Sequence, residues 1–443
     1  MSRIHSGRIF YAGLLEALTQ VMGSAKGYLM DHGPRVALLS AQLGDALGLS
    51  KREISELLFA SILSDMGMVG LAEDAWENPV PYLPPDVRAR VKMHPLRSEE
   101  RVALVPHLGT LAPLVRHHHE WWDGSGYPDS LSGAAIPVGA QILRLADTVA
   151  ALSLPRPHRS ALGRDAIREI VEAGVGREFG PEVARTYLAL DGAGEVPDFD
   201  PKAFRHAVTR AAEHLLPEEV SPLSSDHLLS ILANLIDAKD PYTAGHSRRV
   251  ATLAVAVAGE LGLQAHMKTT LWAGGYLHDL GKLRVPLRIL AKTGRLTNDE
   301  FRQVQAHPSD GAAVLETIPS LRHLTTGARY HHERWDGHGY PEGLRGDHIP
   351  LVGQILAVCD SYDAMTSRRA YRDSLSHAEA VEEVGRCSGE HFSPRVAAAF
   401  LSLPVGAFHD ALIAGMRDAP FVQGAPVFRS PAARAASHAA RAV

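Results

Sequence analysis

Apolar residues recur at helical spacing along most of the chain. Residues 14–22 (LLEALTQVM), 36–47 and 54–63 place apolar side chains three or four positions apart, which predicts amphipathic helices. Residues 136–152 form a longer apolar run, and residues 202–215 repeat the helical pattern. A sustained alternation of apolar and polar residues, which would indicate half-buried strands, does not occur. The pattern therefore predicts an all-α protein.

The helical pattern occurs twice. Residues 228–236 (LLSILANLI) match residues 14–22, and the motif HHHEWWDGSGYP at 117–128 returns as YHHERWDGHGYP at 330–341. Metal-competent residues recur at an offset of 214 positions that becomes 213 further along. A drift of one residue over this length indicates a duplication, and its period is far longer than a solenoid repeat. The matching pairs are His32 and His246, Asp65 and Asp279, His94 and His307, His118 and His331, and Asp147 and Asp360.

The duplication divides the chain into two tandem helical domains. We predict a first domain over residues 1–191 and a second over residues 224–405. Residues 192–223 carry Gly, Pro and acidic residues around one helical segment, and they are interpreted as a linker. The Ala- and Arg-rich residues 406–443 predict a disordered tail.

Composition narrows the classes of function. The chain has 443 residues, 45% of them hydrophobic, so it can bury two cores. A net charge of −5 argues against binding of a nucleic acid polymer, because that requires a broad basic surface. Two cysteines exclude a disulfide framework. The absence of an apolar run long enough to span a bilayer predicts no membrane insertion and a cytoplasmic protein.

The second half gathers more metal-competent side chains than one ion normally takes. Imidazoles with a few carboxylates suit iron, manganese, cobalt, nickel or zinc better than calcium or magnesium. A carboxylate can bridge two ions, so the economical arrangement is a dinuclear centre that shares Asp279. The candidate ligands are His246, His278, Asp279, His307, His331, His332 and Asp360.

Three basic residues near these ligands suit a phosphate group. Lys282 follows Asp279 by three positions, and Arg369 and Arg372 follow Asp360 closely. Each feature also has a structural interpretation when taken alone: a histidine can cap a helix, a Lys or Arg can be a solvated surface cation, and the turn can merely connect helices. Their conjunction favours the functional interpretation.

At these residues the second half resembles the HD-GYP domain family, a branch of the HD metal-dependent phosphohydrolases. The matching motifs are GHSRRV at 245–250, LHDLGK at 277–282, HP at 307–308, HHERWDGHGYP at 331–341, CDSYDAM at 359–365 and RRAYR at 368–372. The resemblance implies hydrolysis of cyclic di-GMP to the linear dinucleotide, to GMP, or to both. It implies two divalent ions, for which we expect iron or manganese first, with cobalt, nickel or zinc as alternatives.

The resemblance also implies a role for each residue. One ion would be held by His246, His278, Asp279 and Asp360, and the other by Asp279, His307, His331 and His332. Some members bind a third ion through a Glu where this chain has Tyr242, so two ions are expected. We assign Asp279 and Lys282 to catalysis. Substrate contacts are assigned to Lys282, Arg369, Arg372, Gly339, Tyr340 and Pro341.

The first half departs from the motif at two positions. Ser64 stands where His278 is required, and Met68 stands where Lys282 is required. Losing a ligand and a phosphate contact predicts a catalytically inert domain with a regulatory or structural role. Two alternatives remain for this half. One metal could bind through Asp65, His94, His118 and His119, or nucleotide could bind through Arg156 and Arg159.

Two further functions compete with cyclic di-GMP hydrolysis. The chain could be a non-catalytic receptor or interaction protein that binds a cyclic dinucleotide or a partner without turnover. It could also hydrolyse another nucleotide, including a mixed cyclic dinucleotide, because base specificity depends on pocket residues that the motifs do not identify. Either a homodimer or a signalling partner is compatible with the sequence.

Overall fold

The computed structural model describes residues 3–24, 31–69, 71, 82–103, 108–156, 158–196, 198–216, 226–239, 245–367 and 374–406. Within these ranges the secondary structure is helical, and the only β-type pairings are isolated bridges such as the one between Asp123 and Ser132. The predicted all-α class is therefore confirmed. No helix in these ranges combines the length and apolar character needed to cross a membrane. The tail predicted for residues 406–443 lies outside the described residues from position 407 onward.

The described helices fall into two matching series. The first contains α1 (Arg3–Ser24), α2 (His32–Ala46), α3 (Lys51–Leu63), η2 (Ser64–Met68), α5 (Pro85–Lys92), α6 (His94–Ala103), η4 (Gly109–Leu111), α7 (Ala112–His117), η5 (Gly133–Ala135), α8 (Val138–Ser153), α9 (Arg164–Gly174), α10 (Pro181–Gly192) and α11 (Pro201–Leu215). The second contains α12 (Asp226–Lys239), α13 (His246–Glu260), α14 (Ala265–Leu277), η7 (Leu280–Arg284), α15 (Leu287–Leu290), α16 (Asn298–Gln305), α17 (His307–Thr317), η8 (Arg322–Leu324), α18 (Thr325–Tyr330), η9 (Gly346–His348), α19 (Leu351–Thr366), α20 (His377–Arg386) and α21 (Pro394–Leu401).

Local sequence signals set where several helices begin. Helices α3, α16 and α20 start with capping boxes, in which a Ser or Thr accepts a hydrogen bond from the backbone of a Glu three residues later and the Glu side chain bonds back. This exchange satisfies backbone donors that have no partner within the helix. The three boxes are Ser50 with Glu53, Thr297 with Glu300 and Ser376 with Glu379.

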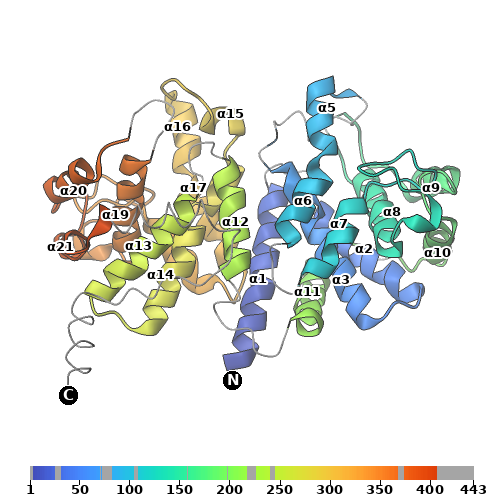
Figure 1. The fold of residues 1–443 in the computed structure, drawn as a ribbon, viewed down its shortest axis with the longest axis horizontal. Coiled ribbons are helices and arrows are strands. Elements are labelled where there is room, and N and C mark those ends of the chain that lie inside the picture. Colours follow the sequence, from blue (N-terminus) through green and yellow to red (C-terminus); the bar gives the residue numbers. More distant parts are fainter. Residues whose placement is uncertain are drawn as a thin grey trace, which may run out of the picture.

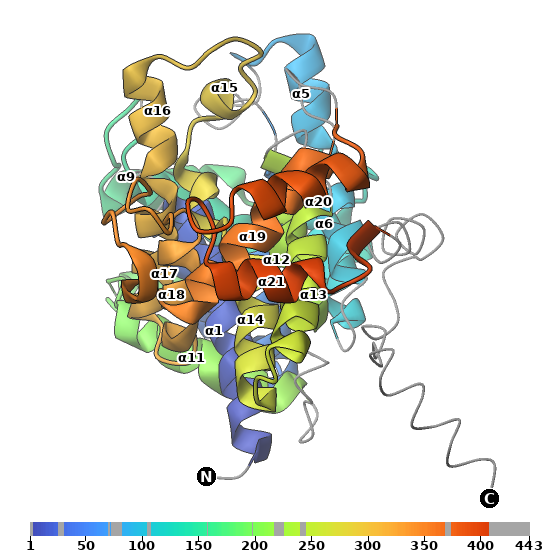
Figure 2. The same ribbon diagram turned by 90° about the vertical axis from the view of Figure 1, so that its left-hand side faces the viewer.

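Helix α1 lies between the two halves. In Figure 1 the blue-to-green first half and the yellow-to-red second half stand side by side, with α1 and α12 near the middle. Helix α1 contacts α2, α3 and α11 on one side and α12, α17 and η7 on the other. Figure 2, which looks from the side of the second half, shows α19, α20 and α21 in front. The two halves therefore share one packed interface.

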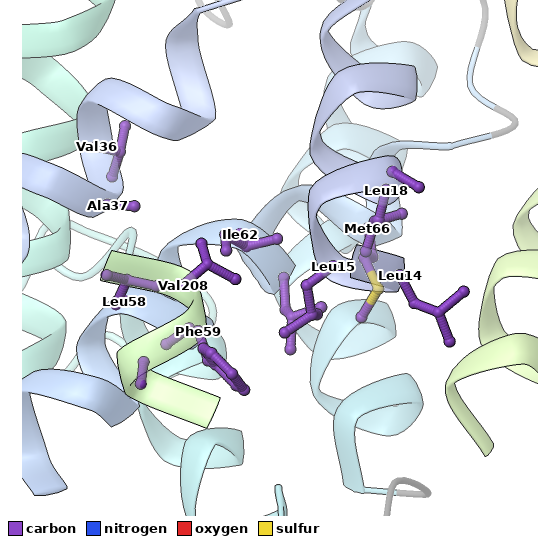
Figure 3. Packing of buried hydrophobic residues seen from close by; sticks show 14 of the residues in the cluster. Leu14, Leu15, Leu18, Val36, Ala37, Leu58, Phe59, Ile62, Met66 and Val208 are labelled. Atoms are coloured by element: carbon purple, nitrogen blue, oxygen red, sulfur yellow. The ribbon is translucent and has the colours of Figure 1, made fainter. Parts of the chain in front are cut away.

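A continuous hydrophobic core follows from this position of α1. Leu14, Leu15 and Leu18 of α1 are fully buried, and they pack in the same cluster as Met66 of η2 and residues of the second half such as Leu280. Figure 3 shows Met66 beside the α1 leucines. The turns that follow α3 and α14 are thus anchored to a common helix.

The helix expected inside the predicted linker packs against the first half. It forms α11, whose apolar face, including Phe204, Val208 and Leu215, is buried in the core cluster. Helix α11 lies against α1 and α3, and Val208 appears beside Leu58 in Figure 3. The division into residues 1–191, 192–223 and 224–405 stays a prediction, with α11 associated with the first half.

Candidate metal centre

Two clusters of metal-competent side chains meet at Asp279. One consists of Asp279, His307, His331 and His332, and the other of His246, His278 and Asp360; within each, the ligand atoms lie within 4.8 Å of one another. Asp279 Oδ1 lies 3.2 Å from His307 Nε2. Asp279 Oδ2 faces the other cluster, at 3.4 Å from His278 Nε2 and 3.7 Å from His246 Nε2. One carboxylate therefore presents an oxygen to each cluster.

Helix ends bring these ligands together from distant parts of the chain. His246 and His307 are the first residues of α13 and α17, and His331 follows the last residue of α18. Asp360 projects from the middle of α19. The structure thus assembles all seven ligands predicted from the sequence, although whether they bind metal stays a prediction.

The His278–Asp279 pair lies at a junction between two helical segments. Helix α14 ends at Leu277, and Asp279 precedes the 3₁₀ turn η7. Gly281 makes this tight turn possible, because a Cβ at that position would lie 2.0 Å from the carbonyl oxygen of His307. In a 3₁₀ turn residues three apart eclipse, so Lys282 Nζ reaches Asp279 Oδ2 at 2.6 Å.

Backbone carbonyls fix the tautomers of three histidines. The Nδ1 atoms of His278, His307 and His331 lie 2.7, 2.6 and 2.8 Å from the carbonyl oxygens of Gly275, Val304 and Ala328, respectively. Because a carbonyl oxygen only accepts, each Nδ1 carries the proton and each Nε2 presents a lone pair.

These lone pairs point into a space that suits cations. His307 Nε2 and His331 Nε2 face each other at 3.2 Å. The Nε2 atoms of His246 and His278 are buried and make no hydrogen bond. Buried acceptors without donors are costly, and a divalent ion would satisfy them. The donor set therefore fits transition-metal ions.

His246 is oriented by two residues that the sequence analysis did not single out. Its Nδ1 donates to Asp363 Oδ2 at 2.7 Å, which leaves Nε2 directed at Asp360 and Asp279. Asp363 is fully buried and is paired with Arg249, whose Nε lies 2.6 Å from Oδ1. A carboxylate behind a ligating histidine fixes its tautomer and increases its basicity. Their spacing in the sequence could have indicated this role, because Asp363 follows Asp360 by three residues and Arg249 follows His246 by three residues.

We expect Asp363→Asn to weaken metal binding by about 10–100-fold, as is typical when the partner of a ligating histidine is changed. The amide cannot serve both His246 and the buried charge of Arg249. Metal titration of the apo protein measures this effect. Asp347→Asn, at an exposed turn, is the control. Equal affinities for the two variants and the wild type would disprove the orienting role.

The electrostatics place His331, His332 and Asp279 in their metal-binding forms. Burial lowers the pKa of His332 to about 3 and that of His331 well below its ordinary value, so both rings are neutral. Burial alone would raise the pKa of Asp279, but the charge of Lys282 holds it well below its ordinary value. Neutral imidazoles and an ionised carboxylate are the states that bind a metal. His246 differs: burial alone would lower its pKa, but the carboxylates of Asp360 and Asp363 raise it to about 10, so a metal would displace a proton there.

The turn at residues 337–341 packs against the His331–His332 pair. The Tyr340 ring stacks on His332 with centroids 4.8 Å apart. Glu333, which is buried, accepts hydrogen bonds from the backbone of Glu342, Gly343 and Leu344. The structure thus places the predicted residues Gly339, Tyr340 and Pro341 beside the ligands. The predicted Arg369, Arg372 and Tyr242 lie outside the described residues.

Gly339→Ala is expected to displace this turn. A Cβ at Gly339 would lie 2.3 Å from Arg334 N and 2.5 Å from Glu333 Cα, which are both backbone atoms. We expect a loss of about 1–3 kcal/mol in unfolding free energy, typical of overpacking, with the metal content unchanged. Chemical denaturation measures it, and Gly294→Ala, where the new Cβ meets nothing within 4 Å, serves as the control. A stability equal to that of the control would contradict this packing argument.

The first half reproduces only part of this arrangement. Its turn is built in the same way, since Tyr127 stacks on His119 with centroids 4.9 Å apart. Ser64 and Met68 lie in η2, the counterpart of η7. A further difference is Ala150, which stands where the second half has Asp363. Without that carboxylate, His32 Nδ1 is buried and makes no hydrogen bond, and its Nε2 bonds to Asp147 at 2.9 Å.

Comparison with known proteins agrees with these features. A family model described as HD domain matches residues 16–183 and 230–396, so the chain belongs to the HD-domain family, present in two copies. Together with the motifs at the site, this identifies the chain as a phosphohydrolase of the HD-GYP type.

Particular relatives match different extents of the chain. The 3'3'-cGAMP-specific phosphodiesterase 1 of Vibrio cholerae is 31% identical over 362 residues, which cover 78% of this chain and 80% of that protein. A cyclic di-GMP phosphodiesterase of Thermotoga maritima is 42% identical over 178 residues, 40% of this chain and 48% of that protein. This chain therefore spans most of the first relative and about half of the second.

A solved structure shares the fold. The crystal structure of a cyclic GMP-AMP specific phosphodiesterase of V. cholerae (V-cGAP3) aligns with a TM-score of 0.58 over 92% of this chain and 98% of that chain, at 22% identity. The tandem helical architecture is thus found in a known protein.

Proposed function

We propose that the second half hydrolyses cyclic di-GMP to the linear dinucleotide, to GMP, or to both, at a dinuclear metal centre. The observation that carries the proposal is the position of Asp279, whose two carboxylate oxygens face two separate ligand clusters. Iron or manganese is the expected metal, with cobalt, nickel or zinc as alternatives. The relatives that are named as phosphodiesterases of cyclic dinucleotides support the reaction class.

Two divalent ions in such a site supply a nucleophile from water at neutral pH and neutralise the charge that develops on a phosphodiester. Residues of the chain would position the metal ligands and the substrate for this reaction. Asp279 holds the two clusters in register, and Asp363 keeps His246 Nε2 directed at the centre. Lys282 lies at the same carboxylate, where an ammonium group can contact a phosphate oxygen.

The remaining substrate contacts are proposed from neighbouring positions. The turn with Gly339, Tyr340 and Pro341 would form the mouth of the pocket, since Tyr340 covers His332. Arg369 and Arg372 follow α19 in the sequence, and α19 carries Asp360; with Lys282 they would neutralise the phosphate. A guanidinium offers fork-shaped donors that match phosphate oxygens.

The first half is proposed to be catalytically inert. It lacks the equivalents of His278, Lys282 and Asp363, with Ser64, Met68 and Ala150 in their places. Its role would be structural or regulatory, because it packs on the second half through α1. A cytoplasmic location and a homodimer or signalling partner stay predictions.

A second candidate substrate is 3'3'-cGAMP. The relative that matches both halves of the chain carries that substrate in its name, whereas the relative from T. maritima, which matches 40% of the chain, is named for cyclic di-GMP. The two dinucleotides differ in one base, so the metal centre would treat their phosphodiester bonds alike.

The two substrates are separated by a direct comparison. Purified protein loaded with Mn²⁺ or Fe²⁺ is given each cyclic dinucleotide alone, and the products are identified by chromatography. We expect a higher kcat/KM for cyclic di-GMP, with linear dinucleotide appearing first. A clear preference for 3'3'-cGAMP would transfer the proposal to that substrate, and binding of both without product would contradict hydrolysis.

A further inference from the structure

The first half retains a group of four metal-competent residues that matches one cluster of the second half. We call Asp65, His94, His118 and His119 the first-half cluster; their ligand atoms lie within 4.8 Å of one another. The distance between His94 Nε2 and His118 Nε2 is 3.2 Å, the same as between the corresponding atoms of His307 and His331. Asp65 Oδ1 lies 3.4 Å from His94 Nε2. This geometry persists although the half lacks other parts of the centre.

Hydrogen bonding makes the facing nitrogens acceptors. His94 Nδ1 lies 2.7 Å from the carbonyl oxygen of Val91, and His118 Nδ1 lies 2.6 Å from that of Val115. Each Nδ1 must therefore carry the proton, and each Nε2 presents a lone pair. Both histidines are only 2% exposed. Two buried lone pairs directed at each other repel, and a cation between them would convert this repulsion into coordination.

The adjoining group of the first half consists of His32, Asp65 and Asp147, and it carries an arginine that the second half lacks. Asp147 accepts a hydrogen bond from His32 at 2.9 Å and lies 3.6 Å from Arg144 Nη1. Arg144 also pairs with Glu178 and donates to His119 Nδ1 at 3.2 Å. The second half has Ala357 at the position of Arg144. A guanidinium is thus present in the first half where the second half has only a methyl group.

We infer that the first half binds a single divalent transition-metal ion through Asp65, His94 and His118, and that Arg144 supplies the positive charge of the missing second ion. The ion would join three elements, η2, α6 and the end of α7. Because Met66 of η2 belongs to the buried cluster that also contains the α1 leucines, labelled in Figure 3, the ion would stabilise the core that the two halves share. Without a second ion or a lysine at position 68, it would be a structural centre.

The test is the metal stoichiometry of the full chain. Apo protein is loaded with Co²⁺, which binds nitrogen and oxygen sites more tightly than Mn²⁺, then desalted and analysed by elemental mass spectrometry. His118→Gln should hold one ion fewer than the wild type and gain less in Tm on addition of Co²⁺. His117→Gln is the matched control, because the neighbouring His117 bonds to Asp129 and lies outside the cluster. It should bind as many ions as the wild type.

Other results would overturn the inference. Equal stoichiometry for His118→Gln and the wild type would show that the cluster is empty, and an equal loss in His117→Gln would show that the lost ion was not held there. Should His118→Gln fail to fold by circular dichroism, Asp65→Asn replaces it under the same criteria. The inference is independent of the proposed function. In a His278→Ala/Asp279→Ala background one ion should remain bound in the first half. Adding His118→Gln to that background should remove this ion, and its retention would contradict the inference.

Discussion

Asp279→Asn is expected to abolish hydrolysis and to release metal from both clusters of the second half. An asparagine keeps the shape of the side chain but removes its negative charge and one of its two acceptor oxygens. The remaining oxygen can face either His307 or His278, so the two clusters no longer share a ligand. Changing a residue that only orients a ligand costs about 10–100-fold in activity, and removing the shared ligand should exceed that loss.

The measurement pairs kcat/KM with metal content for the same preparation. Asp310→Asn is the matched control, because Asp310 lies three residues after His307 but is partly exposed and pairs with Arg284. The control should keep both activity and metal. Should Asp279→Asn retain full activity, the shared carboxylate would not be the basis of the site.

Lys282→Met is expected to lower kcat by about 100–1,000-fold, the usual cost of removing one donor that stabilises the transition state. The substitution installs the residue that the first half has at position 68. Lys282 coordinates no metal in this account, so the second half should still bind its ions. The expected result is thus a protein that holds metal but reacts slowly.

Steady-state kinetics with parallel metal analysis distinguishes a slow Lys282→Met protein that retains its metal from one that has lost the metal site. Arg284→Met serves as the control, since Arg284 belongs to the same 3₁₀ turn but pairs with Asp310. If Lys282→Met and Arg284→Met had the same kcat, the lysine would have no special role.

The seven candidate ligands could be found from the sequence because duplication made their spacing visible. His246, His307 and Asp360 are far apart in the chain, and only the repeated offset and the motifs indicated that they act together. The structure confirms that they are neighbours. The helices were predictable for a related reason, since each buries one apolar face.

Other features depend on packing between distant segments and could not be predicted in the same way. The role of Asp363 depends on α19 placing it behind His246. The position of the His278–Asp279 pair between α14 and η7 follows from the close approach of Gly281 to α17, which no local pattern encodes. Likewise, the contact of α1 with both halves depends on their assembly.

Arg144 shows why aligning motif positions was insufficient. Aligning the motifs of the two halves shows that the first half lacks a histidine and a lysine. Arg144 lies outside those motifs, so the alignment does not single it out. Its proximity to Asp147, His119 and Glu178 becomes visible only when α8 is packed against the turns.

We propose that hydrolysis of a cyclic dinucleotide takes place in the second half alone. This proposal is tested most directly by incubating the Mn²⁺-loaded wild type and the His278→Ala/Asp279→Ala variant with cyclic di-GMP and following linear dinucleotide and GMP over time. We expect product from the wild type and none from the variant. Tight binding without product in the wild type, or undiminished product from the variant, would contradict it.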